Sequence, residues 1–261
     1  MRIFVAGATG LVGSALCLRL RREGHEVVAF VRDVERARAS LGSEVDLLST
    51  SVDDAALRAC LGQCDAVVNL AGAPVAQRWT DGAKDAIRRS RVDLTERIVR
   101  AMPEGTIKSF VSASAVGIYG DRGDESLDAE SATATGWLSQ VCIDWELAAE
   151  GARDKGARVS VLRIGIVLAT HGGALGQMLP AFELGLGGRL GSGKQWMPWI
   201  HLDDLLGLIL FALEDASVDG VLEACAPDPV SNSDFTQALA KACGRPAFLA
   251  IPAFALRLVF G

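Results

Sequence analysis

The chain has 261 residues, half of them hydrophobic, so it can bury a substantial core and is not predicted to be disordered. Its 26 basic and 32 acidic residues are spread along the sequence and give a net charge of -6. This balance argues against nucleic acid or an anionic membrane as a partner and favours a small molecule. No apolar run reaches the ~18 residues needed to span a bilayer, and the first residues lack signal-peptide architecture, so we expect a cytoplasmic protein.

Short apolar runs alternate with segments of helical period along the first 164 residues. Strands are predicted at 2–6, 26–31, 45–49, 66–71, 109–114 and 158–164, and helices at 11–23, 33–41, 53–61, 81–101 and 136–154. Strands that alternate with helices through short joints form parallel sheets with right-handed crossovers. The sequence therefore predicts an α/β fold, a Rossmann-type doubly wound parallel sheet with helices on both faces.

The pattern changes after residue 164, where a glycine-rich stretch precedes an apolar helix predicted at about 203–214. Another helix is predicted in SNSDFTQALAKACG (231–244), with Ser231 or Asn232 as its cap. We assign 1–164 to a dinucleotide-binding domain to which 199–218 returns, and 165–198 with 219–261 to a small C-terminal substrate lobe. The sequence stops inside the apolar run AFALRLVFG, so we expect this lobe to be incomplete.

Cysteine and histidine spacing gives no metal motif. The six cysteines form no CxxC pair, and none has ligand spacing to a histidine. Cys60 and Cys64 would share a helical face, but we interpret them as the structural thiols of a reduced cytosolic protein. The sequence therefore predicts no metal site.

Three glycines stand where the first strand gives way to the first helix, in GATGLVG (7–13). Glycine permits a tight turn and a close approach of the backbone to a pyrophosphate, which then faces the N–H groups at the helix start. The spacing is GxxGxxG rather than GxGxxG, yet strand, turn and helix are all present. We therefore predict a dinucleotide site at this turn.

The end of the second strand, AFVRD, distinguishes between the two nicotinamide cofactors. Arg32 stands where an NAD site usually has an acid for the ribose hydroxyls, and its guanidinium can make a bidentate contact with a 2′-phosphate. Asp33 follows and could still serve a ribose. The sequence predicts NADP, with NAD as the alternative.

Five motifs occur in a fixed order: GATGLVG, DAVVNLAG (65–72), SASAVGIYG (112–120), LRIGIVL (162–168) and WIHLDDL (199–205). With them the chain resembles the extended and atypical branch of the short-chain dehydrogenase/reductase superfamily. The segment LGLGGRLGSGKQWMPWIHLDD (184–204) is similar to the NAD(P)-dependent epimerase family proteins called YfcH-like, some of which carry an older label of cell-division inhibitor. The resemblance covers essentially the whole chain.

The resemblance implies a set of cofactor-binding residues: Gly7, Thr9, Gly10, Leu11, Val12, Gly13, Arg32, Leu70, Ala71, Gly72 and Ser112. The residues of the turn would hold the pyrophosphate, and Arg32 would meet the adenosine end. Residues 70–72 would line the adenine-ribose channel, and Ser112 with Ser114 would lie beside the nicotinamide.

The superfamily's usual chemistry needs a tyrosine as acid and base and a lysine four residues later that lowers its pKa. Trp137 and Val141 stand at these positions, whereas Ser114 keeps the position of the serine that holds the substrate oxygen. The single tyrosine, Tyr119, has Gly123 four residues after it. The ordinary proton-transfer pair is therefore missing from the sequence.

Other candidates for the chemistry are Ser114, Tyr119 and Cys142, with plain packing as the alternative for the last two. Trp196, Lys194 and Arg122 are expected to line the substrate site. Two functions remain open. One is an NADP(H)-binding oxidoreductase or epimerase-like enzyme acting on a small carbonyl or sugar-like substrate. The other is a non-catalytic NADP(H)-sensing or regulatory protein.

Overall fold

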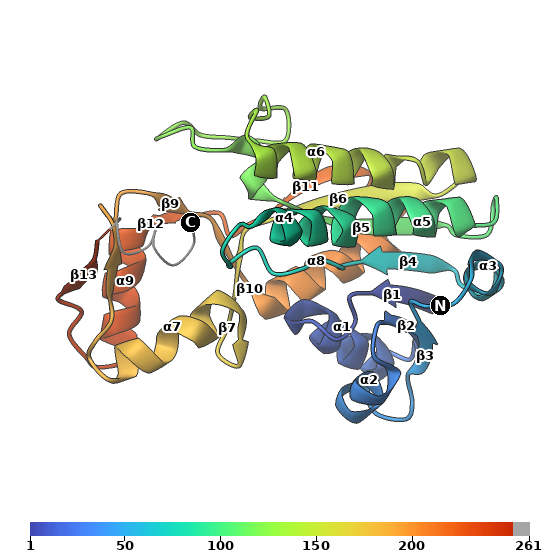
Figure 1. Cartoon of the computed structure of the whole chain (residues 1–261), viewed down its shortest axis with the longest axis horizontal. Coiled ribbons are helices and arrows are strands. Elements are labelled where there is room, and N and C mark those ends of the chain that lie inside the picture. Colours follow the sequence, from blue (N-terminus) through green and yellow to red (C-terminus); the bar gives the residue numbers. More distant parts are fainter. Residues whose placement is uncertain (253–261) are drawn as a thin grey trace.

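A seven-stranded sheet forms the centre of the computed structural model, which describes residues 1–252 (Figure 1). Each neighbouring pair of strands is parallel, and the order across the sheet is β11-β6-β5-β4-β1-β2-β3. The strands are β1 (Arg2–Ala6), β2 (Glu26–Val31), β3 (Asp46–Ser49), β4 (Ala66–Asn69), β5 (Ser109–Ala115), β6 (Arg158–Ile164) and β11 (Gly220–Ala224). The chain runs outward from β1 in both directions, which confirms the predicted Rossmann-type doubly wound sheet.

Helices cover both faces because successive strand residues point to opposite sides. In β1, Ile3 and Val5 face one apolar core and Phe4 and Ala6 face the other. The first core is closed by α1 (Leu11–Arg22), α2 (Val34–Leu41) and α8 (Leu202–Glu214), and the second by α3 (Asp54–Leu61), α5 (Leu94–Ala101) and α6 (Trp137–Glu150). Short 3-10 turns follow β5 at Val116–Tyr119 and α6 at Arg153–Lys155.

The helix predicted at 81–101 is interrupted by a change of helical geometry. α4 (Asp81–Arg88) passes into a π-helical turn, Arg89–Asp93, which continues into α5. A π-helical turn adds a residue to the helix and re-aims the side chains around it. Arg91 is at the middle of this turn.

A small lobe lies at one end of the molecule, beyond the carboxyl ends of the strands (Figure 1). It contains α7 (Gly173–Glu183), β8 (Gly188–Leu190), β9 (Trp196–Met197), β12 (Val230–Ser231), α9 (Asn232–Ala242) and β13 (Leu249–Ile251). At its junction with the sheet, β7 (Ile166–Ala169) pairs with β10 (Trp199–His201). The sequence does not predict α7, because its glycines and Pro180 are typical of a loop.

The structure differs from the expected domain division in one segment. The sequence assigns residues from 219 onward to the lobe, but β11 pairs with β6 and forms an edge of the central sheet. The segment GVLEA is short and contains an acid, so it gives a weak strand pattern. The remainder of the expected lobe at 253–261 lies outside the described residues.

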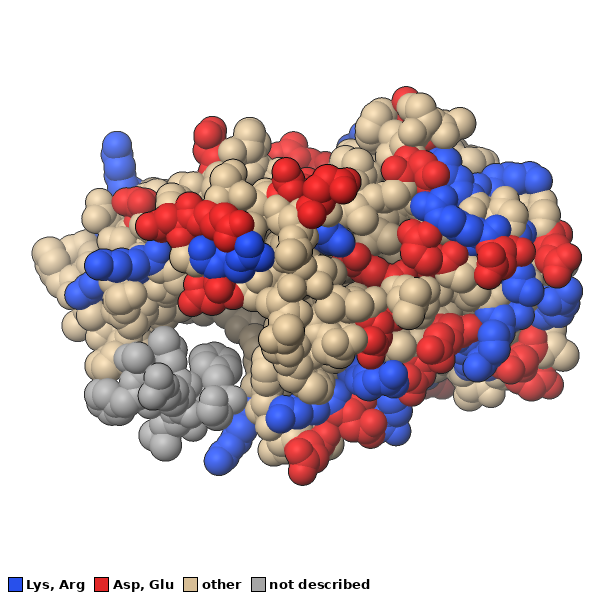
Figure 2. Space-filling model, turned by 90° about the horizontal axis from the view of Figure 1, so that it is seen from above, with Lys and Arg blue, Asp and Glu red and all other residues tan. Residues whose placement is uncertain are grey.

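Charges of both signs are interspersed over the face of the molecule shown in Figure 2, without one dominant basic patch on it. In the described part of the chain, no helix combines the length and the hydrophobicity needed to cross a bilayer.

Candidate cofactor site

The turn between β1 and α1 brings three backbone segments into close contact. Gly7 has φ of 79°, and a Cβ on it would lie 2.6 Å from the carbonyl carbon of Leu70. A Cβ on Gly13 would lie 2.2 Å from the carbonyl oxygen of Gly7. The Gly10 amide donates to that same oxygen at 3.0 Å. Glycine is therefore required at positions 7 and 13, and the turn lies directly against the end of β4.

The first turn of α1 is left open to an anion. Its N-cap is Gly10, which provides no side-chain cap, and no acidic residue occupies the first turn. Side chains cap α2, α3, α4, α8 and α9, whereas α6 and α7 begin, like α1, at a glycine without a side-chain cap. Thr9 and Gly10 are exposed. Unpaired N–H groups and the positive end of the helix dipole suit the phosphates of a dinucleotide.

The small lobe touches this turn through Leu11. A Cβ on Gly172 would lie 3.0 Å from one methyl carbon of Leu11, and a Cβ on Gly173 2.8 Å from the other. Val12 beside it is partly buried. The segment between β7 and α7 therefore packs on the start of α1.

The two residues that follow β2, Arg32 and Asp33, differ in their contacts. Arg32 is exposed and makes no hydrogen bond or ion pair with any residue in 1–252. The carboxylate of Asp33 accepts from the backbone amide of Arg36 at 2.9 Å and caps α2. Asp33 is thus engaged within the protein, whereas the guanidinium of Arg32 is available to a ligand.

The loop after β4 is fixed by internal hydrogen bonds. The Leu70 amide donates to the carbonyl of Ala6 at 2.9 Å, which places Leu70 and Ala71 beside the glycine turn. Gly72 has a different neighbour, because a Cβ on it would lie 2.8 Å from Nη2 of Arg91. The absence of a side chain at Gly72 therefore makes room for an arginine that the sequence reasoning missed.

A row of buried and partly buried polar side chains crosses three strands near their carboxyl ends. In the sheet register, Arg163 of β6 lies between Ser114 of β5 and Glu223 of β11. Glu146 from α6 and Tyr119 from the turn after β5 complete the group. We call these five residues the Arg163 cluster.

Hydrogen bonds connect all members of the Arg163 cluster. The guanidinium of Arg163 donates to both oxygens of Glu146, at 3.0 and 2.9 Å, and to the hydroxyl of Tyr119 at 2.7 Å. The Tyr119 hydroxyl contacts the carboxylate of Glu223 and the carbonyl of Asp128. Ser114 donates to Glu146 at 2.5 Å. The sequence offered one signal for this cluster, an arginine inside a strand predicted to be buried, since such a charge needs partners.

The cluster limits what Ser114 and Tyr119 can do. The hydroxyl proton of Ser114 is held by Glu146, so Ser114 offers a ligand only its acceptor lone pairs. Tyr119 is almost fully buried, and this burial together with the neighbouring Glu223 raises the pKa of its hydroxyl to about 12. This environment favours the packing interpretation of Tyr119.

The remaining candidates near α6 are also apolar or enclosed. Cys142 is buried, and burial raises the pKa of its thiol to about 11, so it stays protonated at neutral pH. Val141 is buried, and the ring of Trp137 packs edge-on against Trp79, with the ring centroids 5.2 Å apart. Ser112 is fully buried in β5. None of these side chains replaces the missing tyrosine and lysine.

Of the three residues expected to line the substrate site, Trp196 and Arg122 both contact the loop after β5 or belong to it. Trp196 of β9 donates its indole N–H to Asp124 at 2.8 Å, which joins the lobe to the loop after β5. Arg122 in that loop is held by both oxygens of Glu125, at 2.8 and 2.7 Å. Lys194 is exposed. Trp196 therefore lies beside the loop that follows β5. The charge of Arg122 is already paired with Glu125.

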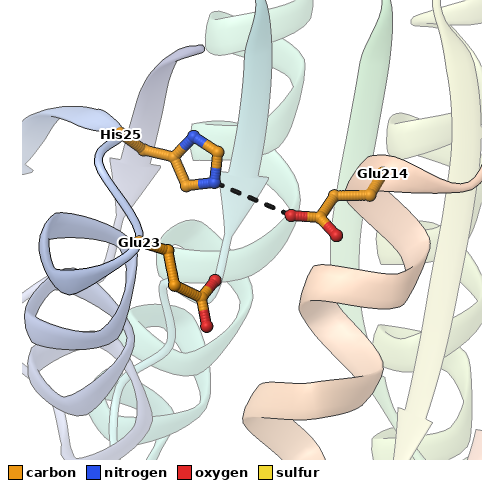
Figure 3. Close-up of side chains that lie close together, drawn as sticks. All are labelled: Glu23, His25 and Glu214. Carbon is orange, nitrogen blue, oxygen red and sulfur yellow. Dashed lines mark ion pairs between the residues drawn. The ribbon is translucent and has the colours of Figure 1, made fainter.

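A group with possible metal ligands, Glu23, His25 and Glu214, lies where β2 begins and α8 ends (Figure 3). His25 precedes β2, and its Nε2 is 3.7 Å from a carboxylate oxygen of Glu214, with Glu23 close by. Glu23 is already paired with Arg19, and Nδ1 of His25 faces the terminal amine of Met1 at 3.3 Å. These groups are satisfied within the protein and lie away from the glycine turn.

Residues 3–223 match the model of the NAD dependent epimerase/dehydratase family. The chain belongs to this family. It is 40% identical over 263 residues to the epimerase family protein Mb2239 of Mycobacterium bovis, covering 99% of this chain and 84% of the relative. It is 36% identical over 267 residues to the human epimerase family protein SDR39U1, covering 100% and 87% of the two chains. The resemblance to an epimerase family is thereby confirmed.

Two solved structures of proteins named epimerases share this fold. The crystal structure of human SDR39U1 (isoform 2) with NADPH has a TM-score of 0.86 and 34% identity, and the match covers 100% of this chain and 86% of that one. UDP-glucuronic acid 4-epimerase from Bacillus cereus has a TM-score of 0.82 at 18% identity, with 97% and 87% covered. The second likeness is one of fold alone.

Proposed function

We propose that this epimerase-family protein binds NADP(H) and acts as an oxidoreductase or epimerase-like enzyme on a small carbonyl or sugar-like substrate. The observation that carries the proposal lies directly after β2, where Arg32 has no hydrogen-bond or ion-pair partner among residues 1–252 and Asp33 caps α2. A free guanidinium at the end of this strand favours a 2′-phosphate over bare ribose hydroxyls. The NADPH in the crystal structure of human SDR39U1 supports the same cofactor.

The described residues fit such a cofactor. The open first turn of α1 would bind the pyrophosphate, and Gly7 and Gly13 let the backbone approach it. Arg32 would bind the 2′-phosphate. When bound, the nicotinamide supplies hydride transfer, and the protein supplies position and electrostatics.

Ser114 would orient a substrate by accepting a hydrogen bond. Because Glu146 holds its proton, a substrate hydroxyl finds an acceptor in Ser114, whereas a substrate carbonyl finds no donor there. This arrangement favours an alcohol or a sugar hydroxyl as the group that meets Ser114.

The first test is a comparison of cofactor affinities. We expect the wild-type protein to bind NADPH more tightly than NADH, as followed by tryptophan and nicotinamide fluorescence. Arg32→Ala removes charged hydrogen bonds and should cost about 1.5–3 kcal/mol of NADPH binding, with little change for NADH. Arg100→Ala, an exposed arginine on α5, is the control. Tighter NADH binding by the wild type, or an Arg32→Ala variant that keeps its NADPH preference, would overturn the proposal.

A non-catalytic NADP(H) sensor is the second candidate, and the buried state of Tyr119 and Cys142 favours it. Bound NADPH should be challenged with aldehydes, ketones and quinones, and bound NADP+ with alcohols and nucleotide sugars. Turnover that Ser114→Ala abolishes supports the enzyme. Unchanged absorbance and no epimerised product with every compound support the sensor.

A further inference from the structure

Arg91 has no acidic partner within the described residues, unlike its neighbours in the same helix. Arg88 pairs with Asp93 at 2.8 Å, and Arg89 pairs with Asp85 at 2.7 Å. All three arginines lie at or beside the π-helical turn. The geometry of the turn thus directs Arg91 inward while Arg88 and Arg89 remain at the surface.

The guanidinium of Arg91 is held in place but not saturated. Its Nη1 donates to the carbonyl oxygens of Ala73 at 3.0 Å and Ile87 at 3.4 Å. Its Nε and Nη2 donate to no group in 1–252, and neither is sealed from solvent. Donors therefore remain for a ligand on the side that faces away from these carbonyls.

Burial of the Arg91 guanidinium costs free energy, and no acidic side chain among the described residues supplies a counter-charge. The guanidinium lies over the ring of Trp145, 5.3 Å from its centroid, and burial lowers the pKa of Arg91. A partly buried cation without a counter-charge is destabilising. A ligand that brings oxygen acceptors would supply the missing partners.

Arg91 stands between the loop after β4 and α6. It packs against Gly72 on one side and against Trp145 on the other, and its charge acts on the thiol of Cys142. Cys142 follows Val141, and Trp145 lies one helical turn beyond Val141 on the same side of α6. Trp145 belongs to the same apolar cluster as Ala113, the residue that separates the two serines, Ser112 and Ser114, in the sequence of β5.

We propose that Arg91 supplies positive charge to the nicotinamide-ribose half of NADP(H), close to position 141, where Val141 stands in place of the superfamily's lysine. Its free N–H groups bind oxygen acceptors of that half, either ribose hydroxyls or the adjoining phosphate. The inference rests on the proposed NADP(H) binding and adds the group that holds the reactive end of the cofactor. In this arrangement Gly72 leaves space for the guanidinium of Arg91, a different role from the adenine-ribose lining that the resemblance implies for it.

Two probes separate the halves of the cofactor. NADPH carries both halves, whereas 2′,5′-ADP carries only the adenosine half with its 2′-phosphate. Arg91→Met should weaken NADPH binding about tenfold to a hundredfold and leave 2′,5′-ADP binding within about twofold of the wild type. Arg89→Met, from the same helical turn, should change neither, and Arg91→Lys should retain part of the NADPH affinity. Circular dichroism of each full-length variant reports whether it is folded.

The outcomes separate this inference from the function on which it rests. A folded Arg91→Met variant that binds NADPH as the wild type does would overturn the inference alone. Equal losses for NADPH and 2′,5′-ADP would also overturn it, because Arg91 would then act on the adenosine half or on the fold. If Arg91→Met is unfolded, Arg91→Lys decides by the same comparison. Failure of the wild type to bind either probe would overturn both proposals.

Discussion

Arg163 is a charged residue in an apolar strand. Its burial is tolerated because its N–H groups donate hydrogen bonds to Glu146 and Tyr119. Its side chain is 7% exposed and that of Glu146 14% exposed, and the two make a bidentate pair. The same guanidinium also supports Tyr119. Removing one partner of a buried pair leaves the other charge uncompensated, which is far more costly than the pair's own net contribution.

Arg163→Met should therefore lower the free energy of unfolding by about 3–5 kcal/mol. The matched control is Arg122→Met, which breaks the pair with Glu125, where the side chains are 30% and 49% exposed. This exposed pair should contribute about 0–1 kcal/mol. Urea denaturation of both variants measures the difference. Equal small losses would mean that the Arg163 cluster contributes little to stability.

At the scale of single elements, the start of α2 shows how a helix cap determines the role of Asp33. Asp33 directly follows Arg32, and the sequence left it as an alternative ribose ligand. In the structure its carboxylate accepts from the Arg36 amide at 2.9 Å, as expected of an N-cap. The cap favours an interpretation in which Arg32 meets the cofactor and Asp33 stabilises the helix.

Asp33→Ala should accordingly lower the free energy of unfolding by about 1 kcal/mol, because a helix cap is lost. NADPH affinity should change by less than about twofold. Asp33→Asn, which keeps a capping oxygen, should retain the stability. Urea denaturation and NADPH titration together test the assignment, and a large loss of affinity with unchanged stability would assign Asp33 to the cofactor instead.

The helix predicted at 81–101 shows which feature of an element the sequence does not predict. Its apolar periodicity indicates the correct span, but the π-helical turn at Arg89–Asp93 depends on how the helix packs against α6 and the loop after β4. For the same reason β11 was not predicted as a strand of the central sheet, since its pairing with β6 is a non-local contact.

At the scale of the whole molecule, burial favours the protonated form of several cysteine thiols and of the Tyr119 hydroxyl. Burial raises the pKa of Cys142 and of Cys225 to about 11, and that of Tyr119 to about 12. A folded-state pKa above the unfolded value means that the folded protein binds more protons than the unfolded chain between the two values. Stability from these groups is complete below the unfolded values and is lost as pH rises through the folded ones.

We therefore expect the free energy of unfolding to fall as pH rises from about 9 to about 11. Urea denaturation at several pH values across this window measures the slope. A Cys142→Ala/Cys225→Ala variant should show a shallower fall, because two of the thiols whose pKa is raised by burial are removed. A stability that is flat or rises over the window would contradict the expectation.

The sequence by itself determined the parallel sheet, most of its strands and helices, the glycine turn and the position of Arg32. These depend on periodicity, glycine conformation and residue order, which act over a few neighbouring positions. Only the tertiary structure decided that Ser114, Tyr119, Glu146, Arg163 and Glu223 form one cluster, and that Arg91 lies beside Gly72 with no acidic partner in residues 1–252. Most of those residues are far apart in the chain, and sheet register and helix packing bring them together.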